Sequence, residues 1–114
     1  MAVSPNFRDF VLEQLQRALP AIRSRRMFGG VGVYSENLFF ALMTGETLYF
    51  KVDDTNRADY DARGLGPWRP FGGDKASMQY YEVGMDILED VDALRPWAEK
   101  AVQVARLARG RKRK

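Results

Sequence analysis

The segment Arg26-Met27-Phe28-Gly29-Gly30-Val31-Gly32-Val33-Tyr34 places three glycines within four positions of a run that otherwise favours a β-strand. Such a cluster is typical of a phosphate-binding loop, a sharp backbone turn or a close approach between two segments. A dinucleotide-binding loop needs a helix after the glycines, whereas Val31 to Tyr34 continues as a strand, and no Walker Gly-Lys-Ser/Thr follows. The segment therefore predicts a bend or bulge between strands, where glycine readily adopts positive φ.

The residues around this bend predict a single α+β domain. Ser4-Pro5 is typical of a helix start, and apolar residues then recur at three- and four-residue spacing as far as Leu19. Turn residues separate expected strands at 31–34, 38–43, 48–52, 68–71 and 78–83, with a short helix after 53–55 and a last helix from Asp90 or Asp92. We predict an antiparallel sheet of about five strands with helices packed on it, in the order α-β-β-β-α-β-β-α.

The stretch from Leu38 to Met43 is apolar at every position. A strand of this kind is expected at the centre of a sheet, with both faces covered. In a small domain the helices can cover one face, and the other face then needs a partner. We therefore expect a homodimer.

Composition restricts the chemistry. The 114-residue chain has no cysteine and no histidine, so disulfides, thiolate zinc sites and nucleophiles paired with histidine are excluded. The acidic residues Asp53, Asp54, Asp59 and Asp61 do not have the spacing of an EF-hand loop, and we interpret them as helix caps or solvated positions. We expect no enzyme activity, no cofactor and no metal.

The charge of the chain is uneven. From Arg106 onward there are six basic residues and no acid, which leaves 12 basic and 15 acidic residues in the rest. We predict a domain over residues 1–105 and a disordered basic tail over 106–114. The tail is interpreted either as a solubilising end or as a weak, non-specific nucleic-acid contact that is sensitive to salt. Its basic residues are Arg106, Arg109, Arg111, Lys112, Arg113 and Lys114.

Neither a membrane span nor a secretory signal is expected, because the chain has no apolar run of about 18 residues and its first residues lack a basic start and apolar centre. The expected location is the cytoplasm. Arg23, Arg25 and Arg26 allow two interpretations, an anion contact or a solvated edge with ion pairs, and the second is favoured.

Ten aromatic residues also allow two interpretations. Stacking of unpaired bases needs interleaved basic residues, which are sparse here, so packing in the core and in a subunit interface is favoured. The set comprises Phe28, Tyr34, Phe39, Phe40, Tyr49, Phe50, Trp68, Phe71, Tyr80 and Tyr81.

Three segments together resemble a known family. Residues 26–34, then Leu48-Tyr49-Phe50-Lys51-Val52-Asp53, then Met78-Gln79-Tyr80-Tyr81-Glu82 resemble the N-terminal domain of the TfoX/Sxy competence regulators over roughly residues 7–108. The motif residues are Arg26, Met27, Phe28, Gly29, Gly30, Gly32, Tyr34, Tyr80 and Tyr81.

The resemblance implies helices packed on an antiparallel sheet and no catalytic residues. In the competence regulators this domain precedes a helical domain, and together they promote transcription of DNA-uptake genes in bacteria. The first functional hypothesis is therefore a cytoplasmic interaction module that acts in transcriptional regulation through a protein partner. The alternatives are nucleic-acid binding through the basic tail and a small-molecule site near Gly29 to Gly32, which would need a pocket there.

Overall fold

The fold is described from a computed structural model, which covers residues 3–27, 29–70 and 75–112. Within these residues, helices and strands follow in an order that confirms the α+β class. The elements are α1 (Pro5–Ala18), β1 (Ile22–Met27), β2 (Gly30–Ser35), β3 (Leu38–Thr44), β4 (Thr47–Lys51), α2 (Arg57–Ala62), β5 (Pro67–Trp68), β6 (Ser77–Glu82), α3 (Met85–Leu88) and α4 (Val91–Lys112).

The strands form one antiparallel sheet in the order β1-β2-β3-β4-β6-β5. Six strands are present rather than about five, because residues 22–27 pair with β2 along their full length. This strand is an edge whose four central residues are exposed, so it lacks the apolar alternation that marks a strand in a sequence. The expected edge strand near Trp68 is present as β5.

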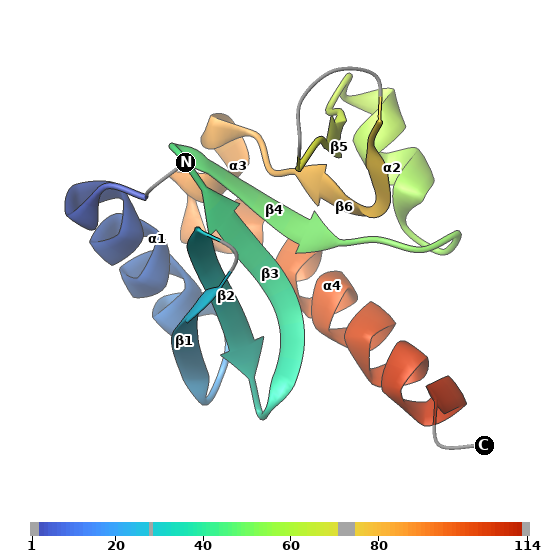
Figure 1. Cartoon of the computed structure of the whole chain (residues 1–114), viewed down its shortest axis with the longest axis horizontal. Helices are drawn as coiled ribbons and strands as arrows, with labels where there is room; N and C mark the ends of the chain where they lie inside the picture. The colour runs from blue at the N-terminus through green and yellow to red at the C-terminus, as the bar shows by residue number, and fades with distance from the viewer. Residues whose placement is uncertain (1–2, 28, 71–74, 113–114) are drawn as a thin grey trace.

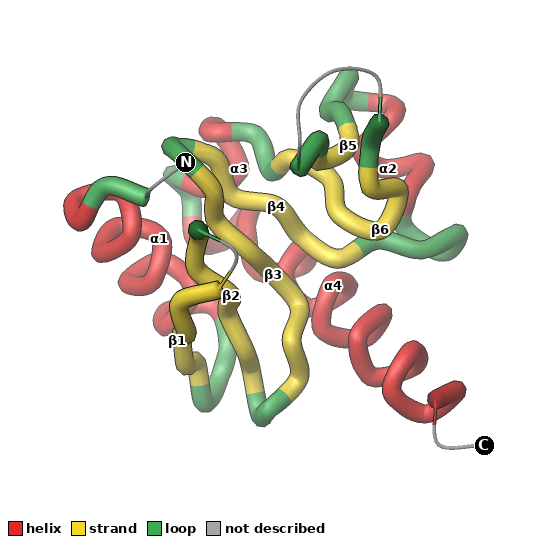
Figure 2. Tube along the Cα trace, in the orientation of Figure 1, coloured by secondary structure: helices red, strands yellow, loops and turns green. Residues whose placement is uncertain are grey.

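The helices lie on one face of the sheet. In Figure 1, α1, α3 and α4 lie behind the sheet. Figure 2, in the same orientation, shows the opposite face of the sheet turned toward the viewer. Between the helices and the sheet lies a core that includes Phe40, Phe50 and Leu94, each fully buried. In the described part of the chain no helix covers the second face, which we call the open face.

The first helix begins as the sequence predicts. The Ser4 hydroxyl accepts a hydrogen bond from the Phe7 amide at 3.2 Å, which satisfies one of the free N–H groups of the first turn. Gln14 is buried on the same helix, and its Nε2 donates to the Leu88 carbonyl at 2.9 Å, which ties α1 to the end of α3. Phe10 was expected on the apolar face of this helix, but its side chain is 36% exposed.

The last helix also begins where it was expected, since the Asp90 side chain accepts from the Asp92 amide at 3.0 Å. Its end corrects the expectation of a disordered tail from residue 106, because α4 continues to Lys112. Residues 106–112 contain good helix formers apart from Gly110, and they extend a helix already held against the sheet. Figure 1 shows this end of α4 projecting past the strands.

The glycines form the predicted bend. Gly29 has a φ of +75° in the turn between β1 and β2, a conformation that favours glycine. At Gly30 a Cβ atom would overlap the carbonyl oxygen of Met43, so β2 and β3 approach closely there. The bulge lies further along, between Val33 and Tyr34 in the pairing with β3.

Candidate functional site

Five aromatic side chains form a continuous row on the open face, which we call the aromatic row. Ring centroids are 5.2 Å apart for Tyr34 and Phe39, and 6.0 Å apart for Phe39 and Tyr80. The ring centroid of Trp68 lies 6.1 Å from that of Tyr80 and 6.1 Å from that of Tyr49, so Trp68 connects Tyr49 to the row. These spacings are typical of favourable aromatic pairs. The row joins residues of β2, β3, β4, β5 and β6 across the sheet.

Strand register explains why these rings share one face. Tyr34 lies opposite Phe39, and Lys51 lies opposite Tyr80, and residues directly opposite each other point to the same side. The irregular register between β2 and β3 leaves Phe40 as an extra residue between Phe39 and Ala41, so Phe40 and Ala41 both join the helix-side core.

The ten aromatic residues singled out in the sequence therefore divide into two sets, apart from two that the structure does not describe. Phe40, Phe50 and Tyr81 belong to the core, which confirms core packing for them. The aromatic row contains the other five described residues, whose use in an interface stays a prediction. Phe28 and Phe71 lie outside the described residues.

Basic groups lie against the aromatic row. The Lys51 Nζ is 5.1 Å from the centre of the Tyr80 ring, and the Arg23 guanidinium is 6.0 Å from that of Tyr34. Arg23 also donates to the Asn37 side chain at 2.6 Å, so it is held at the rim. The sparse basic residues in the sequence gave no sign of this arrangement, which depends on cross-strand neighbours.

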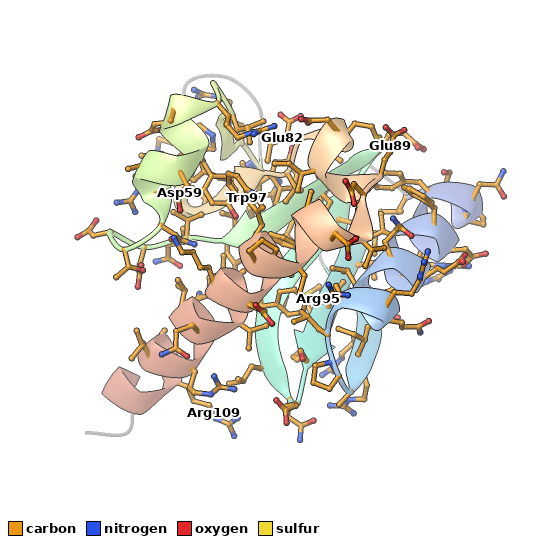
Figure 3. The ribbon with its side chains drawn as sticks, turned by 180° about the vertical axis from the view of Figure 1, so that it is seen from behind. Asp59, Glu82, Glu89, Arg95, Trp97 and Arg109 are labelled. Atoms are coloured by element: carbon orange, nitrogen blue, oxygen red, sulfur yellow. The ribbon has the colours of Figure 1, made fainter. Side chains whose placement is uncertain are left out.

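Two tyrosine phenols of this protein, those of Tyr60 and Tyr80, have a raised pKa. Burial, with a smaller contribution from Tyr34, raises the pKa of the Tyr80 phenol to about 12. Burial also raises the pKa of the Tyr60 phenol, whose ring makes an edge contact with Trp97 at 4.8 Å. Figure 3, viewed from the covered side, shows Trp97 on α4 near α2. Both phenols are therefore suited to packing rather than proton transfer.

The family-motif residues gather at the first hairpin and on the open face. Gly32 carries no side chain where a Cβ would lie 2.5 Å from the Met27 methyl and 2.9 Å from the Phe39 ring. Tyr34 and Tyr80 belong to the aromatic row, whereas Tyr81 is in the core. The remaining motif residues Arg26, Gly29 and Gly30 lie at the hairpin, and Phe28 lies outside the described residues.

The space beside Gly30 and Gly32 is filled by Met43, Met27 and Phe39, and the hollow that borders Gly30 is an apolar space of only about 10 Å³. An open surface depression of about 470 Å³ borders Gly29 at the turn, between Arg8 and Arg26. A small-molecule site at the glycines stays a hypothesis that would have to use this depression.

The basic residues of α4 are only partly described. Arg106 lies 3.9 Å from the Glu36 carboxylate, at the same turn where Arg23 contacts Asn37. Figure 3 labels Arg109 near the free end of α4. Arg109 lines a groove of about 480 Å³ between α4 and the ends of β3 and β4. The side chains of Arg111 and Lys112 and the whole of Arg113 and Lys114 lie outside the described part of the chain.

Three of the four aspartates interpreted as caps or solvated positions have structural partners. Asp53 accepts from the Thr55 amide at 2.8 Å, Asp54 pairs with Arg57, and Asp59 pairs with Lys100 at 2.9 Å. The described residues contain no group of three side chains arranged to hold a metal ion. In the same residues, no helix is both long enough and apolar enough to cross a membrane.

A six-stranded antiparallel sheet with helices on one face (Figure 1) and a row of aromatic rings on the other defines a small α+β domain with one sheet face that no described helix covers. Residues 13–105 match the TfoX N-terminal domain, and the chain belongs to that family. The membership supports a competence-type regulatory module at the level of the family. No curated protein matches the chain.

Proposed function

We propose that the protein is a non-enzymatic regulatory module that binds a protein partner through the open face of its sheet. The observation that carries this proposal is the aromatic row, five side chains in mutual contact on the face that no described helix covers. Aromatic residues are enriched in the centres of protein interfaces and charged residues are depleted there. The row consists of such aromatic residues; Arg23 lies at its margin, and Lys51 extends over the Tyr80 ring within it.

The shape of the open face fits a flat protein surface better than a small ligand. The hollow lined by Leu42 and Trp68 is an apolar space of about 10 Å³, and the groove of about 480 Å³ that reaches Phe39 and Lys51 lies at the edge of the face, against α4. A drug-sized ligand needs a cavity of roughly 300 Å³ or more. A sheet face of this kind instead packs against another sheet or a helix.

Affinity capture from a bacterial lysate tests the proposal. The bait is the whole chain, compared with Phe39→Glu on the open face and with Phe10→Glu on α1 as the matched control. From a lysate that also contains the untagged chain, we expect the wild type and the control to retain the same protein, that chain or another one, and Phe39→Glu to lose it, with circular dichroism unchanged. Equal retention by both variants would contradict the proposal, as would turnover of a metabolite without any retained protein.

A second candidate function is nucleic-acid binding by the end of α4. The observation that favours it is the continuation of the helix past the strands, which presents Arg106 and Arg109 on an ordered arm. Glutamine at each basic position from 109 to 114 keeps the chain length and removes this charge. We expect the change to lower duplex-DNA affinity and to flatten its salt dependence. An unchanged salt slope would reject the arm as the contact.

A further inference from the structure

One cross-strand line on the open face begins and ends with opposite charges. Arg25 pairs with Gly32, Gly32 with Leu42, Leu42 with Tyr49, and Tyr49 with Glu82. Directly opposed residues share a face, so all five lie on the open side. Four steps of about 4.8 Å separate the ends of this line, which is therefore about 19 Å long. Leu42 lies at its middle.

Both end charges are available to another molecule. Arg25 and Glu82 are exposed. Among the described residues, neither side chain takes part in an ion pair or a side-chain hydrogen bond. The fold thus places one unpaired cation and one unpaired anion two strands away from Leu42, on opposite sides of it.

We propose that a second copy of this chain covers the open face, related by a two-fold axis that runs along β3 above Leu42. Rotation about this axis keeps each cross-strand line in place and reverses its direction. Arg25 of one copy then faces Glu82 of the other, and the contact occurs twice, as an isologous interface requires. The strands of the two sheets run in similar directions, which is the aligned form of sheet packing. The inference rests on the proposed use of the open face for protein binding.

The charges select this arrangement over the other two-fold arrangement. An axis across the strands would place β1 of one copy over β1 of the other and set the Arg23 and Arg25 side chains against like charges. Like charges facing each other in an interface are strongly unfavourable. The axis along β3 instead places β1 of one copy over β6 of the other and keeps the two β1 strands apart.

A charge exchange tests the proposal on the purified full-length chain. Sedimentation equilibrium at low salt is compared for the wild type, Arg25→Glu, Glu82→Arg and the double exchange, with Glu99→Arg on the exposed side of α4 as control. We expect a dimeric wild type, a dissociation constant raised about tenfold or more by each single reversal, and recovery in the double exchange. The control should remain dimeric.

Three results would overturn the proposal. They are a monomeric wild type at tens of micromolar, single reversals that leave the dimer unchanged, and a double exchange that fails to recover. Circular dichroism of each variant excludes unfolding as the cause. A monomeric wild type whose captured protein is lost in Phe39→Glu would overturn the self-association alone and leave the protein-binding function standing. Binding of a single-stranded oligonucleotide by a monomer, lost in Phe39→Glu, would overturn both.

Discussion

The rings of Phe39 and Tyr80 are 6.0 Å apart, so β3 contacts β6 across the intervening strand β4. Lys51, on the intervening strand, lies opposite Tyr80, and its long side chain extends over the Tyr80 ring. The contact between the two rings makes the open face continuous from Tyr34 to Trp68. The proposed docking function depends on this continuity.

Two adjacent phenylalanines should differ in their contribution to stability. Phe40 is fully buried in the core, whereas Phe39 is half-buried on the open face. We expect Phe40→Ala to lower the free energy of unfolding by about 3–5 kcal/mol and Phe39→Ala by only about 1–2 kcal/mol. Urea unfolding of both variants checks the difference. Equal losses would show that the bulge in β3 does not separate the two side chains.

Two glycines should respond to alanine in opposite directions. A Cβ at Gly30 would overlap the Met43 carbonyl oxygen, and we expect Gly30→Ala to destabilise by about 1–3 kcal/mol. Gly110 lies within α4 with open space around it, so Gly110→Ala should raise helix content and stability slightly. Thermal unfolding followed by circular dichroism measures both. A neutral Gly30→Ala would contradict the close approach of β2 and β3.

The buried hydrogen bond from Gln14 to the Leu88 carbonyl should be important for the packing of α1 on α3. Gln14→Leu leaves that carbonyl without its partner, and we expect a loss of about 1–2 kcal/mol in the free energy of unfolding. Gln16→Leu, on the exposed side of the same helix, is the matched control and should change little. Denaturant unfolding that ranks the two variants equally would argue against the buried bond.

Stability should decline at alkaline pH. The Tyr80 phenol has an ordinary pKa of 10.0 and a folded pKa of about 12, so the folded state holds the proton more tightly. The resulting stabilisation is complete below pH 10 and declines as the pH rises toward 12. Tyr80→Phe removes this ionisation. Between about pH 9 and pH 12 we expect the free energy of unfolding of Tyr80→Phe to fall by about 2 kcal/mol less than that of the wild type. Urea unfolding across this range would contradict the burial if both proteins declined equally.

Local sequence signals were sufficient for most of the fold. The Ser4 cap, Asp90 before α4 and the glycine bend each depend on residues that are close together in the chain, so the sequence alone can predict them. The edge strand β1 was missed because its exposed arginines need no apolar alternation. The helical end of α4 was missed because a run of basic residues is typical of both a tail and a solvated helix.

The candidate site was less accessible from the sequence. Membership of the aromatic row depends on strand register, and one extra residue at Phe40 decides which of two neighbouring phenylalanines faces the core. The line from Arg25 to Glu82 joins residues 57 positions apart through three intervening strands. Such pairings arise only when the sheet is assembled.

Photo-crosslinking in living bacteria tests the central claim most directly. A photoreactive phenylalanine analogue is placed at position 39 on the open face, and at position 99 on the exposed side of α4 as the control. We expect protein adducts from position 39 and few or none from position 99, with adduct mass separating a second copy from another protein. The absence of protein adducts at position 39, or equal adducts at both positions, would contradict a protein-docking function for the open face.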